Sequence, residues 1–358
     1  MGGVPGVLLC LWCRGGCSAA EVAAALTFFP PEPPFYKLEK KSDGEDLALV
    51  VEEGLEVRYS LHSLMWQCNL MHCSSTSHYI PLLPLAGQKE NKISRRNGAA
   101  QGKGRGGEGE SLVLTMIRSS GKSGGSDIPV ALYRTEGAKR TILCSHGNAT
   151  DLGAMHDRCA ELAKELGVNV VGYDYTGYGC ATGHASEANT YADIKAVYGW
   201  IRQNLCGEGE DGSGSGEGHG IVLYGQSVGS GPTCFLASRE PCAGVILHSP
   251  IMSGMRVLTE SRILSCLDIY PNLDRIGLVS CPVMVIHGME DEEVFWEHGR
   301  GLHNAVPEPS KREPWWVPGK GHNDICEGDA QLREFHRRIK AFLASLGPGA
   351  GATNNNGG

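Results

Sequence analysis

Ser227 lies between two glycines in the stretch IVLYGQSVGSG, residues 221–231, at the spacing G-x-S-x-G. This spacing is typical of a serine nucleophile that sits on a sharp turn between a strand and a helix. The spacing alone decides little, because the chain contains 50 glycines and a second match, GKSGG around Ser123, lies in a polar, loop-like run. Ser227 differs from Ser123 because an apolar, strand-like run precedes it and a helical pattern follows it. We therefore take Ser227 as the candidate nucleophile.

The acid and base that would activate such a serine follow it in the chain. Asp291 stands in HGMED and His322 in GKGHND, each after an apolar, strand-like run. A serine hydroxyl is a weak nucleophile until an imidazole accepts its proton, which is the role we assign to His322. Asp291 would hold the imidazole in the useful tautomer and stabilise its charged form. Glu290 and Glu292 flank Asp291 and are the alternative acids.

Backbone amides are expected to stabilise the negative charge that develops on the substrate oxygen. One amide comes from the residue after the nucleophile, Val228, and the other from a loop that follows an earlier strand. That loop is SHGNATDLG, in which Asn148 is the candidate donor and Ala149 the alternative. Each such donor stabilises the transition state by about 3–4 kcal/mol.

These residues need a sheet that brings the ends of separate strands together. From residue 139 onward, short apolar runs rich in β-branched residues alternate with helical patterns, including helices predicted at 153–166 and 330–345. Uniformly apolar strands that alternate with helices predict a mostly parallel central sheet with helices on both faces, and ligands bind at the C-terminal ends of its strands. Only about 30 residues separate GVILHSP from PVMVIHG, so we expect a minimal cap over the site.

Several segments are more specific than these general features: SHGNATDLG, YDYTGYG, YADI, YGQSVG, HSPIMSGMRV, PVMVIHGMEDE, GHND and FFPPEP. With them the chain resembles the α/β-hydrolase domain-containing protein 17 family. The resemblance implies the α/β-hydrolase fold and a serine hydrolase that removes palmitate from cysteines of other proteins. It implies that Ser227 is the nucleophile, Asp291 the acid and His322 the base. It also implies S-acylated, membrane-associated protein substrates and a location at the cytoplasmic face of membranes, such as the plasma membrane and endosomes.

The same segments divide the chain into regions. Residues 61–110 and 207–219 depart from the family pattern as insertions. We expect a Cys-rich membrane-anchoring N-terminus at 1–30, an irregular and strand-containing region at 31–85, a mostly disordered Gly-rich insertion at 86–126, the catalytic domain at 127–346 and a disordered tail at 347–358.

Three cysteines, Cys10, Cys13 and Cys17, lie close together beside apolar residues near the N-terminus. We favour S-acylation, because two or more acyl chains convert weak membrane contact into lasting attachment. One alternative is a zinc half-site made by the C-x-x-C pair, which would need a second pair such as Cys68 and Cys73. The other alternative is a signal peptide, although the segment lacks a leading basic residue.

The bulk composition excludes some classes of function. The net charge is −8, and we find no basic face of the kind that binds nucleic acid. The longest apolar run, near VPGVLLCLW, is shorter than the roughly 20 residues that span a bilayer. No metal or cofactor is expected. A general lipid esterase or a serine peptidase of the same fold remains the alternative enzyme, and a non-catalytic scaffold is the alternative from a different class.

Overall fold

The computed structural model describes residues 23–25, 27–40, 47–51, 110–121, 125–206, 220–258 and 268–347. The predicted anchor cysteines Cys10, Cys13 and Cys17 and the second serine motif at Ser123 lie outside these residues, as do segments 52–109, 207–219 and 348–358. The strands are β1 (Tyr36–Lys40), β2 (Leu47–Val51), β3 (Glu110–Ser119), β4 (Ser126–Thr135), β5 (Arg140–Ser145), β6 (Asn169–Tyr173), β7 (Gly220–Gln226), β8 (Gly244–His248), β9 (Val283–Gly288) and β10 (Trp315–Val317).

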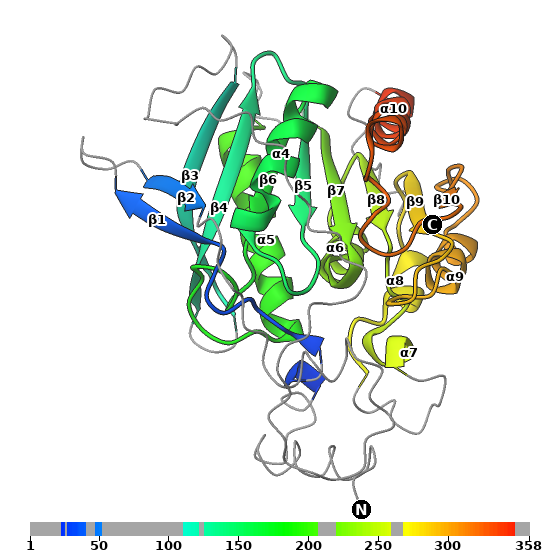
Figure 1. The fold of residues 1–358 in the computed structure, drawn as a ribbon, viewed down its shortest axis with the longest axis horizontal. Coiled ribbons are helices and arrows are strands. Elements are labelled where there is room, and N and C mark those ends of the chain that lie inside the picture. The colour runs from blue at the N-terminus through cyan, green and yellow to red at the C-terminus, as the bar shows by residue number, and fades with distance from the viewer. Residues whose placement is uncertain are drawn as a thin grey trace, which may run out of the picture.

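Eight of these strands form one sheet in the order β10-β9-β8-β7-β5-β6-β4-β3 (Figure 1). The strands from β10 to β6 run parallel to one another, whereas β4 and β3 are antiparallel additions at one edge. Strands β1 and β2 form a separate antiparallel pair. Because β7, β9 and β10 are parallel, their C-terminal ends lie at the same edge of the sheet, which is where a site is expected.

Two of the longer helices, α4 (Leu152–Leu166) and α5 (Glu187–Asn204), begin at residues whose side chains cap them. The Asp151 carboxylate caps the first of them by accepting from the Ala154 amide, and Gly167 ends it in the left-handed conformation, at φ 65°. The helices are α4 (Leu152–Leu166), α5 (Glu187–Asn204), the short 3₁₀ turn η1 (Ser227–Gly229), α6 (Ser230–Ala237), α7 (Gly254–Leu258), α8 (Asn272–Ile276), α9 (Glu297–Ala305) and α10 (Asp329–Ser345). The helices predicted at 153–166 and 330–345 correspond to α4 and α10.

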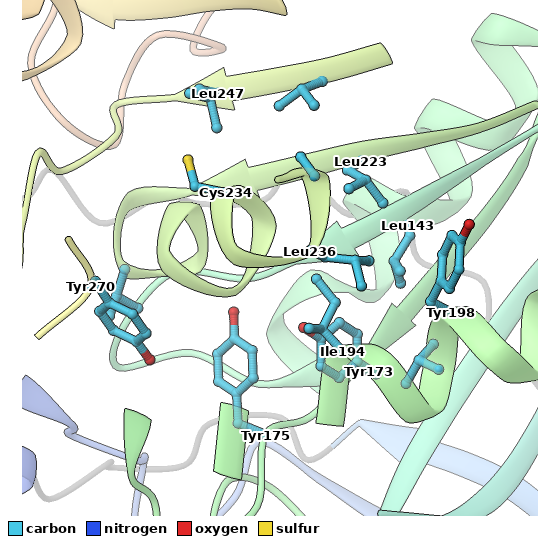
Figure 2. Close-up of a cluster of buried hydrophobic side chains, with 14 of the residues drawn as sticks. Leu143, Tyr173, Tyr175, Ile194, Tyr198, Leu223, Cys234, Leu236, Leu247 and Tyr270 are labelled. Atoms are coloured by element: carbon cyan, nitrogen blue, oxygen red, sulfur yellow. The ribbon is translucent and has the colours of Figure 1, made fainter. Parts of the chain in front are cut away.

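Helices cover both faces of the sheet, and alternate strand residues point to opposite faces. Ile142 packs on the face covered by α4 and α10, and its neighbour Leu143 packs on the face covered by α5 and α6. Figure 2 shows the second face, where Leu143 and Leu223 from the strands lie toward Leu236 of α6. The predicted mostly parallel central sheet with helices on both faces is therefore confirmed.

Strand β3 lies within segment 86–126, of which the structure describes residues 110–121 and 125–126. It pairs with β4 along its whole length from Glu110↔Thr135 to Ser119↔Ser126. The apolar run SLVLTMI within it is the reason, because the antiparallel ladder satisfies its backbone groups while Ile117 packs against the core. The sheet therefore begins before residue 127.

Two further features concern the helices. In the described part of the connection from β8 to β9, the helices are the short α7 and α8. No helix among the described residues is long and apolar enough to cross a bilayer.

Candidate active site

Ser227 sits on a sharp turn between β7 and α6. Its φ is 52°, a left-handed value that costs a non-glycine residue strain. The flanking glycines are needed here because neighbouring atoms leave no room for a side chain. A Cβ at Gly225 would lie 2.5 Å from the Thr233 hydroxyl oxygen, and one at Gly229 would lie 2.3 Å from the Ser145 carbonyl oxygen. The motif thus allows the turn that ends β7 to pack closely against both α6 and β5.

Asp291 follows β9 and is buried. Its Oδ1 accepts the backbone N–H groups of Glu293 at 3.0 Å and Val294 at 2.8 Å, while its Oδ2 lies 2.7 Å from His322 Nδ1. Burial acts to raise the pKa of Asp291, but hydrogen bonds from His287 and His322 outweigh it and hold the pKa below its ordinary value. Asp291 therefore stays ionised.

His322 follows β10 and presents one nitrogen to Asp291. Because Nδ1 lies at the carboxylate, Nε2 is the nitrogen that can exchange a proton with a substrate or a serine. Burial acts to lower the pKa of His322, but the hydrogen bond and the charge of Asp291 dominate, so the pKa is raised. Backbone hydrogen bonds join the two loops: the Met289 amide donates to Val317 O and the Glu290 amide to Lys320 O, both at 2.9 Å.

The structure thus brings Asp291 and His322 into direct contact and places Ser227 at the same edge of the sheet, after β7. No hydrogen bond among the described residues joins Ser227 to His322. Hydrogen bonds between a nucleophile and its base often tighten only when substrate binds. The arrangement can support nucleophilic acyl transfer by a serine.

The loop after β5 lies beside Ser227, since a Cβ at Gly147 would lie 3.7 Å from the Ser227 Cβ. Within the described chain, no hydrogen bond uses the backbone N–H of Asn148 or of Val228, the two candidate oxyanion donors. The alternative donor, Ala149, has its N–H directed to Asn148 Oδ1 at 3.1 Å. Asn148 and Val228 are therefore better placed than Ala149 to bind an oxyanion.

Sequence reasoning missed one residue of the site. This residue is His287, whose Nε2 lies 3.1 Å from Asp291 Oδ2 and 2.8 Å from the Val294 carbonyl oxygen. The only available signal was its place at the end of a strand, four residues before Asp291. The other strand-end histidines, His146 and His248, have pKa values lowered by burial to about 4 and about 3. They are neutral near pH 7, in keeping with a structural role.

Asp174, directly after β6, organises the region behind the loop after β5. It is fully buried, and its carboxylate accepts the Tyr36 hydroxyl at 2.5 Å and the Leu152 amide at 2.8 Å. Burial, followed by the charge of Asp151, raises the pKa of Asp174 to about 8. This carboxyl group thereby ties β1 to the start of α4. Within the described residues, no cluster of three His, Cys, Asp or Glu side chains could hold a metal ion.

Comparison with other sequences identifies close relatives. No family model matches the chain. Alpha/beta hydrolase domain-containing protein 17C of Xenopus tropicalis is 44% identical over 209 residues, 58% of this chain and 63% of the relative. The match thus spans about three fifths of the length of such 17C relatives. Alpha/beta hydrolase domain-containing protein aho-3 of Caenorhabditis elegans is 41% identical over 94% of this chain and 81% of its own. The human 17B protein is 32% identical over 94% of this chain and 95% of its own.

Solved structures resemble the chain in fold. An esterase of Pyrococcus furiosus aligns with a TM-score of 0.51 and 18% identity, covering 66% of this chain and 92% of the esterase. Est1E of Butyrivibrio proteoclasticus, solved with ferulic acid bound, aligns with a TM-score of 0.51 and 16% identity, covering 65% of this chain and 98% of Est1E. At these identities the likeness shows the fold alone.

Proposed function

Because the chain belongs to the alpha/beta hydrolase domain-containing protein 17 family, and is therefore a hydrolase, we propose that it is a serine hydrolase that cleaves the thioester of S-palmitoylated proteins. The hydrogen bond of 2.7 Å between His322 Nδ1 and Asp291 Oδ2, at the sheet edge that carries Ser227, is the observation that supports a Ser-His-Asp mechanism most directly. The resemblance to the family implies the same roles for these three residues.

The first half of the reaction forms an acyl-enzyme. Ser227 Oγ attacks the thioester carbonyl carbon while its proton passes to His322 Nε2, and Asp291 stabilises the resulting imidazolium. The amides of Asn148 and Val228 bind the oxyanion of the tetrahedral intermediate. The carbon–sulfur bond then breaks, and the imidazolium returns its proton to the departing cysteine sulfur.

The second half releases the fatty acid. His322 Nε2 accepts a proton from water, whose oxygen attacks the acyl-enzyme carbonyl carbon. The ester bond to Ser227 breaks, and the serine oxygen takes its proton back from His322. Palmitate leaves, and the free enzyme is restored without any metal or cofactor in the scheme.

The substrate class rests on two considerations. The described connection from β8 to β9 carries only the short helices α7 and α8, and a sparsely covered site suits a bulky protein substrate better than a small one. Acylation of Cys10, Cys13 and Cys17 would hold the enzyme at the cytoplasmic face of membranes, where S-acylated proteins also lie. A shared surface raises the effective concentration of enzyme and substrate.

Labelling with a fluorophosphonate probe tests the chemistry. We expect stoichiometric labelling of the native chain and of Ser123→Ala, and none of Ser227→Ala. A native chain that resists the probe and hydrolyses no ester would favour a non-catalytic scaffold.

A second assay compares matched substrates on one acyl peptide: the thioester, the oxygen ester and the amide. Preference for the thioester supports the proposed substrate class. Preference for the oxygen ester or the amide would instead identify a lipid esterase or a peptidase of the same fold.

A further inference from the structure

The side chain of Asn148 binds a distant part of the chain. Its Oδ1 accepts the Phe29 amide at 3.0 Å and the Tyr178 hydroxyl at 2.7 Å, besides the amide of its own neighbour Ala149 at 3.1 Å. Its Nδ2 donates to the Thr27 carbonyl oxygen at 2.6 Å. Both ends of one amide side chain therefore hold residues 27–29 against the loop that follows β5.

Neighbouring contacts fasten the same segment, residues 27–36, which we call the strap. Phe28 is 7% exposed, and its ring packs edge-to-face against Tyr178 at 6.5 Å and Tyr270 at 6.0 Å between centroids. Aromatic pairs of this kind stabilise the packed arrangement beyond the area that they bury. At the other end of the strap, the Phe35 amide donates to the Asp151 carboxylate at 2.7 Å.

The loop held by the strap has a strained conformation. Ala149 has a φ of 51°, and such a residue persists at a positive φ only where surrounding contacts determine it. The contact that acts here is the acceptance of the Ala149 N–H by the Asn148 side chain. The backbone amide and the side chain of Asn148 share one Cα, so contacts that hold the side chain restrict rotation of the amide about the Asn148 N–Cα bond. An oxyanion donor is effective only within about 2.7–3.1 Å of the developing charge.

From these contacts we infer that the Asn148 side chain is a positioning group, through which the strap holds the Asn148 backbone amide in its oxyanion-binding direction. The inference rests on the proposed serine hydrolase function and adds a positioning residue to that site.

Asn148→Leu tests the inference, because it removes every side-chain hydrogen bond and keeps the backbone amide. We expect kcat for a soluble thioester to fall on the order of 10- to 100-fold with little change in KM, since a misplaced donor weakens transition-state binding and leaves substrate binding intact. The affinity for an acyl trifluoromethyl ketone, which forms a tetrahedral adduct on the serine, falls by the same factor. Asn204→Leu, the same substitution on the exposed end of α5, leaves both quantities at native values.

Phe28→Leu supplies a second variant that loosens the strap without altering Asn148. It is expected to show the same loss of kcat, smaller in size, and it keeps the test decisive should Asn148→Leu fail to fold. Rates are normalised to end-point fluorophosphonate labelling, so that loss of folded protein is not read as loss of turnover.

Four outcomes are distinguishable. A fall in kcat that follows the loss of trifluoromethyl ketone affinity supports the inference. Native kcat per labelled site in both variants, with only a lower melting temperature, overturns it, and so does a rise in KM at constant kcat. A native chain that is neither labelled nor active refutes the proposed function itself, and the inference with it.

Discussion

His287 and His322 converge on one oxygen of Asp291. His322 Nδ1 lies 2.7 Å from Asp291 Oδ2, and His287 Nε2 lies 3.1 Å from the same atom. His287 Nε2 also lies 2.8 Å from the Val294 carbonyl oxygen, which can only accept a hydrogen bond, so Nε2 carries the proton and donates to both oxygens. Asp291 is therefore neutralised in part by a donor other than its proposed catalytic partner.

Removing that donor is expected to change the pH profile. In His287→Ala, the Asp291 carboxylate loses one hydrogen bond and interacts more strongly with the His322 imidazolium, so the pKa of His322 rises. A hydrogen bond is worth about 1 kcal/mol, or about 0.7 pH unit, so the acid limb of kcat/KM should move upward by about that amount. His287→Gln, which keeps an N–H donor, should stay close to native.

The neighbouring histidines do not titrate within the acid limb of kcat/KM. Burial lowers the pKa of His298 to about 4 and that of His248 to about 3, so both are neutral across the acid limb. An unchanged limb in a folded His287→Ala enzyme would show that His287 has a packing role alone.

Asp291→Asn should lower turnover on the order of 10⁴-fold, because an amide in that position stabilises the wrong tautomer of the imidazole and no imidazolium. Single-turnover kinetics on a soluble thioester measures the effect, and circular dichroism checks the fold. Glu290→Gln and Glu292→Gln are the matched controls, since both side chains are exposed. Full activity in Asp291→Asn would transfer the acid role to one of these glutamates.

The pH dependence of the native enzyme follows from the raised pKa of His322. The base must be neutral to accept the serine proton, so kcat/KM should fall as the pH drops through a value above the ordinary 6.5 of an imidazole. A profile that is flat from mildly acidic to alkaline pH, with chemistry shown to limit the rate, would exclude an imidazole base.

The stability of the folded protein should fall as the pH rises, over the same range in which kcat/KM rises. A group whose pKa is raised by folding stabilises the protein fully below its unfolded pKa, and that contribution disappears as the pH rises through the folded pKa. The melting temperature of the native chain should therefore lose this contribution from about pH 6.5 upward, as the base becomes competent. Asp291→Asn lacks the negative charge that raises the pKa of His322, so its melting temperature should depend less on pH over the same range.

Membrane attachment and the hydrolysis of a soluble thioester are expected to be independent of each other. Replacing Cys10, Cys13 and Cys17 together by serine removes the proposed acyl chains, each buried methylene of which contributes about 0.8 kcal/mol. The protein should then leave the membrane fraction and keep its activity on a soluble thioester, while activity on membrane-bound acyl-proteins falls. Cys206→Ser, within the folded domain, is the control.

Two results would contradict this expectation. A triple variant that stays fully in the membrane fraction would place the anchor elsewhere. A triple variant that loses soluble activity would give these cysteines a structural role.

The sequence predicted the parts of the site that depend on short-range pattern. Ser227, Asp291 and His322 each follow an apolar run, and the rule that parallel strands end at a common edge was enough to group them. The role of the Asn148 side chain was not predictable, because its partners Thr27 and Phe29 lie about 120 positions away in the chain and are joined to it only by the fold.

Other features were hidden by composition or by an ordinary appearance. Strand β3 falls next to glycine-rich sequence, and its pairing partner β4 is identified only by the fold. In the sequence, His287 resembles any histidine that precedes a glycine at a turn. Its hydrogen bond to Asp291 is shown only by the distance between the two side chains.

Helix α10 has a consequence for biosynthesis. Its buried residues Phe335, Ile339 and Phe342 complete the core on the face shared with α4, and Arg140 of β5 donates to the Leu346 carbonyl oxygen beyond its end. A chain leaves the ribosome N-terminus first, so the part of that face that α10 covers stays uncovered until α10 emerges. A premature stop before residue 329 would spare Ser227, Asp291 and His322, yet the product would expose this face to chaperones and proteases. Such truncations should lower the amount of protein in the cell before they affect its chemistry.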